Sequence, residues 1–122
     1  MNWQQNMSAI TIYHNPNCSK SKKTLDLLKK QNIEPTIIEY LINPPTPETL
    51  KELLKKLGLT AREIMREKEQ PYSDNNLSDP AISEDDLLEI MSLNPILIER
   101  PIVVKGARAV LGRPPENIME LL

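Results

Sequence analysis

Two β-branched runs enclose a helical pattern within the first forty residues. Ala9–Tyr13 predicts a short strand that ends in turn formers, and Pro35–Tyr40 predicts a second strand. Between them, leucines recur among Lys and Asp from Ser19 to about Lys30, which predicts a helix. A strand, a helix and a strand over about thirty residues form a βαβ unit. The two strands are therefore expected to be parallel, with a right-handed crossover.

The segment after this unit is expected to be helical. Thr46 provides an N-cap and Pro47 the first helical position of a helix that ends at Gly58. The stretch Thr60–Glu63 has the pattern of a capping box and predicts another helix through Glu67.

The remaining sequence predicts one more helix, a hairpin and a final helix. Gln70–Pro80 is polar and is interpreted as a loop, after which Ser83 caps a helix. Pro101–Val104 and 107–111 predict two strands of an antiparallel hairpin, and Glu116–Leu122 predicts a last helix.

This order predicts an α/β, thioredoxin-like fold: βαβ, a helical insertion at about 46–93, then ββα around a mixed four-stranded sheet. We expect a flexible extension at 1–8 and a single domain at 9–122, which is long enough to bury a core without disulfides. The net charge of -2 gives no general attraction to nucleic acid or anionic lipid. No apolar run suits a membrane helix, and the first seven residues lack signal-peptide features. We therefore expect a cytoplasmic protein.

Cys18 is the only cysteine of the chain and His14 is the only histidine. This composition excludes an internal disulfide and a zinc site of the usual ligand count, so no metal is expected. A lone cysteine is often a small buried hydrophobic residue. If Cys18 is instead a nucleophile, an outside thiol has to resolve its adduct.

Cys18 stands where the loop after the first strand meets the first helix. The unpaired amides and the dipole at a helix N-terminus favour an anion there. Three lysines in the next five residues add positive charge, and His14 and Ser21 are candidates to donate hydrogen bonds to the sulfur. We therefore predict a reactive thiol with a pKa in the range of about 3.5–7.5 known for such sites.

All five arginines lie beyond residue 60. Arg62 and Arg108 are interpreted as surface residues. Arg100 and Arg113 each precede a proline, at the start of a predicted strand and of the last helix. Arginine binds a tetrahedral oxyanion through two parallel hydrogen bonds, so these positions are candidates for an anion pocket.

Several motifs match one family in order and spacing. They are YHNPNCSKS at 13–21, EPTII at 34–38, NPP at 43–45, NPILIERPIVV at 94–104 and GRP at 112–114. Through them the chain resembles the glutaredoxin-linked arsenate reductases over nearly all residues after Ser8. Lys22 replaces a common arginine, and the chain stops at Leu122 without a further helical tail. In both respects it is closest to the short arsenate reductase-like subgroup.

The resemblance implies a thioredoxin-like fold with a cis bond before Pro101. It implies that Cys18 attacks arsenate and that glutathione, acting as a co-substrate, attacks the resulting adduct. Glutaredoxin then removes the glutathione and arsenite is released, with no tightly bound cofactor. We expect the protein to act as a monomer.

The resemblance also assigns roles to further residues. Arg66, Arg100 and Arg113 match three arginines that bind and stabilise the oxyanion. His14 matches a residue that helps to lower the pKa of the cysteine. Ser21 matches a serine that hydrogen-bonds the thiolate.

Two other functions remain open at this point. One is general glutathione-dependent thiol exchange, in which arsenate is incidental. The other is binding to RNA polymerase, as in the Spx-type regulators, which resemble this chain in fold, length and the Arg-Pro strand. Their redox switch is a CxxC pair, whereas residues 18–21 contain one cysteine. A protease triad or a phosphatase Cys-x5-Arg loop is not present in the sequence.

Overall fold

The computed structural model describes residues 9–122, so the expected extension at 1–8 lies outside the described residues. The chain forms two compact units. One contains the residues up to Tyr40 together with Arg100–Leu122, and the other contains Leu41–Glu99. The helical insertion expected at about 46–93 falls inside the second unit. The expectation of a single domain stays a prediction.

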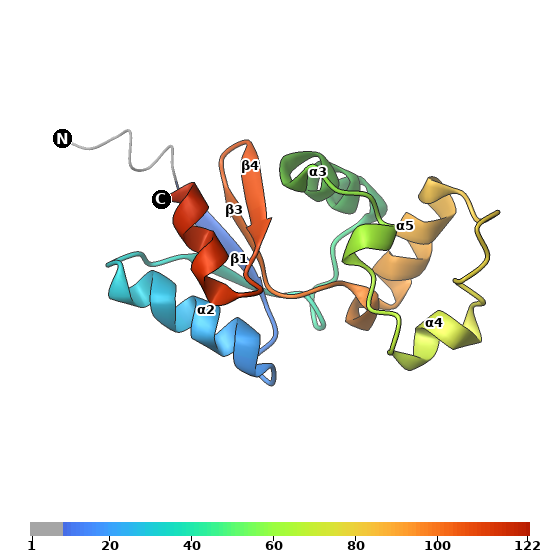
Figure 1. Ribbon diagram of the computed structural model, residues 1–122, viewed down its shortest axis with the longest axis horizontal. Helices are drawn as coiled ribbons and strands as arrows, with labels where there is room; N and C mark the ends of the chain where they lie inside the picture. Colours follow the sequence, from blue (N-terminus) through green and yellow to red (C-terminus); the bar gives the residue numbers. More distant parts are fainter. Residues whose placement is uncertain (1–8) are drawn as a thin grey trace. The chain divides into compact units, whose positions relative to one another are not determined.

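The first unit is built on a mixed four-stranded sheet with the order β2-β1-β3-β4 (Figure 1). Strand β1 pairs in parallel with β2 and antiparallel with β3, which in turn pairs antiparallel with β4. This confirms the predicted βαβ unit and hairpin. The strands are β1 (Ile10–His14), β2 (Thr36–Glu39), β3 (Ile102–Lys105) and β4 (Arg108–Leu111).

One face of the sheet is covered by α2 (Ser19–Lys30) and by η3 (Pro115–Leu121), the red helix that ends at the C-terminus in Figure 1. This unit has a core cluster of aliphatic side chains, in a chain that has no phenylalanine. Burying each of these contributes roughly 1.5–3 kcal/mol. The cluster contains Ile10, Ile12, Leu28, Val103, Ile118 and Leu121. The last helix was predicted, but it is a 3-10 helix.

All the regular elements of the second unit are helices. They are α3 (Pro47–Leu57), η1 (Arg62–Ile64), α4 (Gln70–Asp74), α5 (Glu84–Leu93) and η2 (Pro95–Leu97). The predicted caps are confirmed: the hydroxyl of Thr46 accepts the N–H of Thr49 at 3.1 Å, and Gly58 ends α3 with a φ of 70°. Ser83 caps α5 through the N–H of Asp86.

The helix predicted from Thr60 through Glu67 is wrong in its length. The capping box does form, since the N–H of Thr60 donates to the carboxylate of Glu63 at 3.0 Å. However, the helix is only the three residues of η1, and Met65 is extended and bridges Ile98. A long-range backbone pairing therefore overrides the local helical signal.

The loop predicted at Gln70–Pro80 is also corrected, because its first five residues form α4. Pro71 lies in the first turn of this helix, where a missing N–H costs nothing. No helix within residues 9–122 is both long and apolar enough to cross a membrane.

Hydrogen bonds join three segments in a junction near the start of α2. The segments are α2 itself, the residue that follows β4 and the residue that precedes β3. The hydroxyl of Thr24 hydrogen-bonds the carbonyl of Gly112 at 3.1 Å, and the N–H of Gly112 donates to the carbonyl of Pro101 at 2.9 Å. The bond between Arg100 and Pro101 is cis, which confirms the expectation, and so is the bond between Arg113 and Pro114. The junction thus fixes the backbones that carry both arginines.

We predict that Gly112→Ala destabilises the protein by about 1–3 kcal/mol through overpacking. A Cβ at this position would lie 2.7 Å from Oγ1 of Thr24 and 2.8 Å from Cγ of Pro101. Urea denaturation measures the free energy of unfolding of Gly112→Ala, Thr24→Ala and the double variant. Because Thr24 supplies two of the three close atoms, the double variant is expected to lose less stability than the sum of the single losses. Strictly additive losses would contradict this account.

Candidate active site

Cys18 is the N-cap residue of α2, in extended conformation. The turn that delivers it is held by two contacts of Asn15. The N–H of Asn17 donates to the Asn15 side chain at 2.9 Å, and the N–H of Cys18 donates to the Asn15 carbonyl at 3.1 Å. The carbonyl of Cys18 accepts the N–H of Lys22, which starts the helix. The free thiol is half-buried at the N-terminus of α2.

The guanidinium of Arg100 lies near the sulfur of Cys18 and favours its thiolate form. Burial alone raises the pKa of the Cys18 thiol, because it penalises the thiolate. The polar and charge interactions with Arg100 outweigh this effect, together with the backbone N–H groups of Ser21 and Lys20. The net result is a lowered pKa, in the direction predicted from the helix start.

Arg100 is half-buried, and its Nε and Nη1 are shielded from water. Burial tends to lower the pKa of its guanidinium, but the contacts with Cys18 and Tyr40 raise it, so the group stays charged. Tyr40 is 1% exposed and was not recognised as a site residue in the sequence. One signal was available, because an aromatic with a hydroxyl directly follows the second strand of the parallel pair.

His14 and Ser21 contact each other. Nδ1 of His14 lies 2.6 Å from the hydroxyl oxygen of Ser21, which also accepts the N–H of Asn15 at 3.0 Å. Burial lowers the pKa of His14, with Lys29 and Lys22 adding to the effect and Glu39 opposing it. The imidazole is therefore neutral at neutral pH. It is the backbone N–H of Ser21 that faces the sulfur, so the thiolate-activating roles of both side chains stay predictions.

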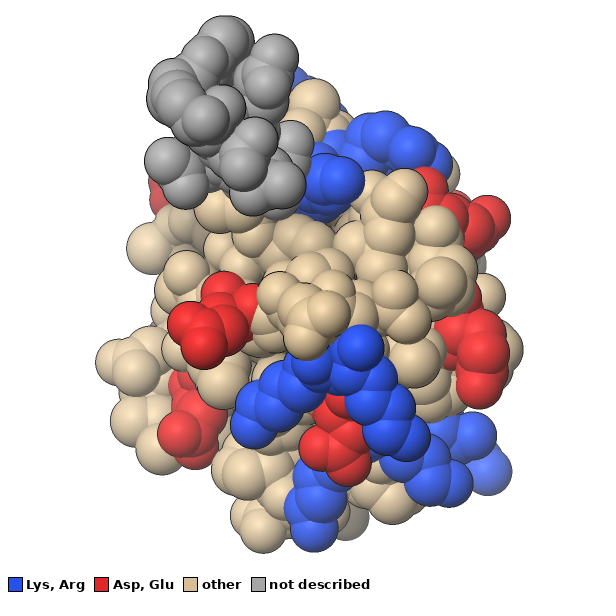
Figure 2. Space-filling model, turned by 90° about the vertical axis from the view of Figure 1, so that its left-hand side faces the viewer, with Lys and Arg blue, Asp and Glu red and all other residues tan. Residues whose placement is uncertain are grey.

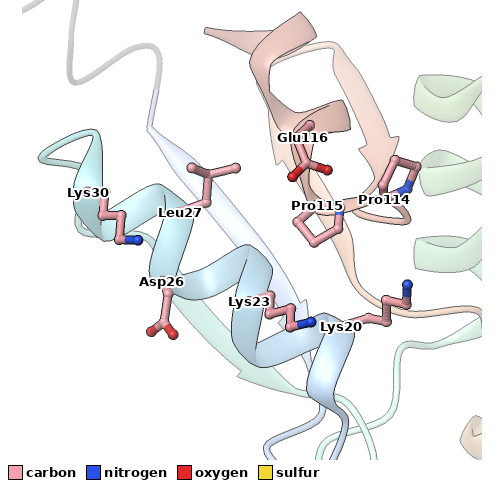
Figure 3. A pocket seen from close by; sticks show the side chains of 8 residues that line it. All are labelled: Lys20, Lys23, Asp26, Leu27, Lys30, Pro114, Pro115 and Glu116. Atoms are coloured by element: carbon pink, nitrogen blue, oxygen red, sulfur yellow. The ribbon is translucent and has the colours of Figure 1, made fainter.

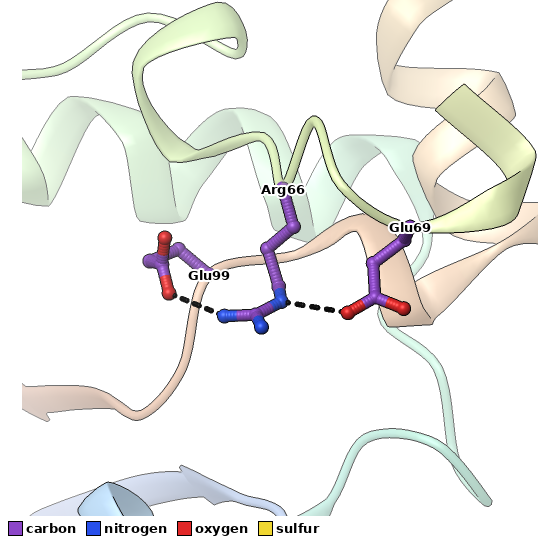
Figure 4. Close-up of polar contacts among 3 residues, drawn as sticks. All are labelled: Arg66, Glu69 and Glu99. Atoms are coloured by element: carbon purple, nitrogen blue, oxygen red, sulfur yellow. Dashed lines mark hydrogen bonds and ion pairs between the residues drawn. The ribbon is translucent and has the colours of Figure 1, made fainter. Parts of the chain in front are cut away.

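Arg66 belongs to the second unit and is held there by two glutamates (Figure 4). Its Nε lies 3.2 Å from the carboxylate of Glu69, and its Nη1 lies 2.8 Å from that of Glu99. Its backbone N–H donates to the carbonyl of Leu97 at 2.8 Å. The guanidinium is thus oriented by both its backbone and its ion pairs. Its predicted role toward an oxyanion stays a prediction.

Arg113 is half-buried and directly follows Gly112 of the junction. Its carbonyl accepts a hydrogen bond from the side chain of Asn117 at 3.2 Å. Arg100 and Arg113 each precede a cis proline. Since the backbone N–H of Gly112 donates to the carbonyl of Pro101, the backbones of the two arginines lie next to each other. An oxyanion-binding role for Arg113 is compatible with this placement and stays a prediction.

A charged hollow of about 430 Å³ lies between α2 and the start of η3 (Figure 3). Three lysines and two carboxylates line it, together with the apolar Leu27, Pro114 and Pro115. The charged residues are Lys20, Lys23, Lys30, Asp26 and Glu116. In the view of Figure 2, Lys and Arg side chains gather around an acidic side chain in the lower part of the face. Cys18 does not line this hollow, although Lys20 is two residues away from it.

We predict that Arg100→Gln raises the apparent pKa of the Cys18 thiol toward the ordinary value of about 8.5. The reason is that the variant removes both the charge and the polar interaction that stabilise the thiolate. The rate of alkylation by iodoacetamide, followed against pH, measures this pKa. Arg108→Gln is the matched control, since Arg108 is exposed on β4. An equal pKa in the natural protein and in Arg100→Gln would contradict the assignment.

Comparisons with known proteins point to one family. The model of the ArsC family matches residues 13–121. The protein YfgD of Escherichia coli K12, which has no assigned function, is 50% identical over 114 residues, covering 93% of this chain and 96% of its own. An arsenate reductase of Escherichia coli K12 is 42% identical over 116 residues, covering 95% of this chain and 82% of its own.

A solved structure of an arsenate reductase from Vibrio cholerae has the same fold. It superposes with a TM-score of 0.92 at 49% sequence identity, and the match covers 94% of this chain and 98% of the other. The residues that the family model matches include the segment with Cys18 and the Arg-Pro strand. The chain belongs to the ArsC family.

Proposed function

We propose that this protein reduces arsenate to arsenite with Cys18 as its nucleophile, and that glutathione and glutaredoxin supply the electrons. The observation that carries the proposal is the position of Cys18 at the N-terminus of α2 with the Arg100 guanidinium near its sulfur, which together lower the pKa of the thiol. It joins an activated thiol to a charged group that suits an oxyanion. The similarity to arsenate reductases at 42% identity and above supports arsenate as the oxyanion.

The first step joins the thiolate of Cys18 to arsenic. The sulfur attacks arsenic, and an arsenate oxygen leaves as water after taking up protons, so an S–As bond replaces an As–O bond and arsenic stays As(V). Arg100 next to the sulfur would stabilise the negative charge on the arsenate oxygens in the transition state. The N-terminus of α2 would contribute its amides to the same anion.

The next steps need thiols from outside the chain, because Cys18 is its only cysteine. Glutathione displaces a second oxygen of the adduct as water and forms a second S–As bond. The thiol of glutaredoxin then attacks the glutathione sulfur, forming a mixed disulfide and leaving the electron pair on arsenic, which becomes As(III). Hydrolysis of the remaining S–As bond releases arsenite and returns Cys18 as a thiol. The two electrons come from glutathione and glutaredoxin.

Four further side chains have proposed roles in this cycle. Arg66 and Arg113 would complete the oxyanion site with Arg100. Arg66 would have to bind the oxyanion while its guanidinium keeps its ion pairs with two glutamates. The pair of His14 and Ser21 would hold the turn before α2, so that the backbone N–H of Ser21 faces the sulfur.

The lysines of α2 support an anionic reductant. All five are exposed, and three of them line the hollow beside η3. Glutathione carries two carboxylates and one ammonium group, which suits a hollow with three lysines and two carboxylates. We propose that glutathione acts as a co-substrate without a tightly bound cofactor, on a monomer in the cytoplasm, where thiols are kept reduced.

We predict that the purified protein forms arsenite from arsenate when both glutathione and glutaredoxin are present, and that Cys18→Ser forms none. Chromatography of the arsenic species measures the product. Arg100→Ala is expected to lower kcat/KM for arsenate about 100-fold, as for the loss of an anion-stabilising donor. Arg62→Ala is the control, because Arg62 donates to the carbonyls of Leu77 and Asp79 in the second unit. If the natural protein forms no arsenite but reduces glutathione mixed disulfides, general thiol exchange replaces this proposal.

We predict that the double variant Lys20→Glu/Lys23→Glu raises the KM for glutathione several-fold and leaves the KM for arsenate nearly unchanged. Two charge reversals beside the hollow would repel the carboxylates of the tripeptide. Steady-state rates at varied glutathione, measured at low and high salt, test this. Lys51→Glu on α3 is the matched exposed control. An unchanged KM for glutathione would place the reductant elsewhere.

A further inference from the structure

Asn15 places an amide side chain in the interior of the protein, between the end of β1 and the start of α2. It is 7% exposed, although asparagine is usually a surface residue. A buried polar group is costly unless it makes hydrogen bonds. The partners of Asn15 therefore indicate why the sequence has an amide at this position.

Three hydrogen-bonding groups of Asn15 bond three later residues. The side-chain Oδ1 accepts the N–H of Asn17 at 2.9 Å, and the backbone carbonyl accepts the N–H of Cys18 at 3.1 Å. The backbone N–H donates to the hydroxyl oxygen of Ser21 at 3.0 Å. Ser21 is the third residue of α2. Asn15 therefore bonds the turn, the N-cap residue and the helix itself.

The sequence of the turn suits these bonds. The N–H of Cys18 closes a β-turn over residues 15–18, with asparagine first and proline second, which are favoured positions for both. Pro16 has a restricted φ and no N–H to satisfy. The Asn15 side chain adds a bond to the N–H of the third residue, which the backbone of the turn leaves without an acceptor.

Both ends of this set of bonds are anchored. Asn15 directly follows β1, which is paired with β2 on one side and with β3 on the other. At the other end, Ser21 is fully buried, and its hydroxyl oxygen lies 2.6 Å from Nδ1 of His14. The start of α2 is thus tied to the end of a central strand.

We propose that Asn15 is a positioning residue, which holds Cys18 at the N-terminus of α2. Cys18 is the N-cap residue, with a φ of -106° and a ψ of 124°. From an N-cap a side chain faces the unpaired amides and the positive end of the helix dipole. Loss of the bond between Oδ1 and Asn17 loosens the turn and moves the sulfur out of this alignment. For arsenate turnover this role rests on the proposed reductase function, whereas its effect on the thiol does not.

The test compares Asn15→Ala with Asn17→Ala. We expect the apparent pKa of Cys18 alkylation by iodoacetamide to rise by about 0.5 unit in Asn15→Ala, a size typical of a weakened helix-dipole interaction. The thiolate fraction then falls about threefold at a pH below both values. Asn17→Ala is the matched control and keeps the natural pKa, because Asn17 is exposed and contributes only its backbone N–H to the turn. A folded Asn15→Ala with an unchanged thiol pKa would overturn the proposal.

A conservative variant and a destabilised variant separate positioning from a general loss of stability. Serine accepts the same N–H through its hydroxyl, but more weakly than asparagine, so we expect a smaller rise in Asn15→Ser than in Asn15→Ala. Ile118→Val destabilises the aliphatic cluster, and we expect it to leave the thiol pKa unchanged. If the thiol pKa rises as much in Ile118→Val as in Asn15→Ala, stability alone explains the effect and the proposed role is wrong.

A measurement on the natural sequence covers the case in which Asn15→Ala does not fold. Amide hydrogen exchange, followed by nuclear magnetic resonance, reports on the N–H of Asn17. Since this exposed residue donates its N–H to Oδ1 of Asn15, we expect exchange about tenfold or more slower than in an unstructured peptide of the same sequence. Exchange at the rate of the unstructured peptide would show that the side chain does not hold the turn, and would contradict the proposal.

If arsenite is formed, the pH profile provides one more readout. A lower thiolate fraction reduces kcat/KM for arsenate only where the thiol is partly protonated. We therefore expect Asn15→Ala to lose about threefold at low pH and to approach the natural protein at a pH where both thiols are ionised. A loss of equal size at every pH would contradict a role that acts through the thiol.

Discussion

The contact between the Arg100 guanidinium and the Cys18 sulfur is the interaction on which the rest of the site depends. Burial alone would keep the thiol protonated, and the helix amides add to the opposing effect of Arg100. The contact requires that Arg100 enter the sheet beside the turn before α2. The antiparallel pairing of β1 with β3 and the junction of Thr24, Gly112 and Pro101 provide this geometry. Much of the first unit therefore helps to place the charge of Arg100 near the sulfur of Cys18.

Local signals were sufficient for much of the fold. The bounds of α2 and α3, the caps at Thr46 and Ser83, the parallel pair of strands and the hairpin all followed from periodicity and turn residues. The helix predicted from Thr60 was wrong in its length because two distant segments pair there. The capping box at Thr60 forms as its sequence indicates, yet the helix ends early because Met65 pairs with Ile98. No local pattern contains that information.

The site was predictable in part for the same reason. The position of Cys18 at a helix start is a local feature and was found from the sequence. The contacts of Arg100 with Cys18 and Tyr40 join residues that are sixty or more positions apart in the sequence, so spacing alone did not identify Tyr40. Likewise, the resemblance to the arsenate reductases assigned a role to Arg66, but it did not identify the two glutamates that orient it. The residue types indicated the chemistry of the site, whereas the tertiary structure determines which residues contact one another in it.

The most direct test of the account is a joint titration of Cys18 and Arg100 in the natural protein. The carbon signal of Cys18 Cβ and the nitrogen signal of Arg100 Nε are followed by nuclear magnetic resonance against pH. The account predicts one shared inflection at a pH below about 7.5, in the range of thiolates at helix N-termini. An inflection of Cys18 near the ordinary value of about 8.5, with an Arg100 signal that does not move, would contradict it.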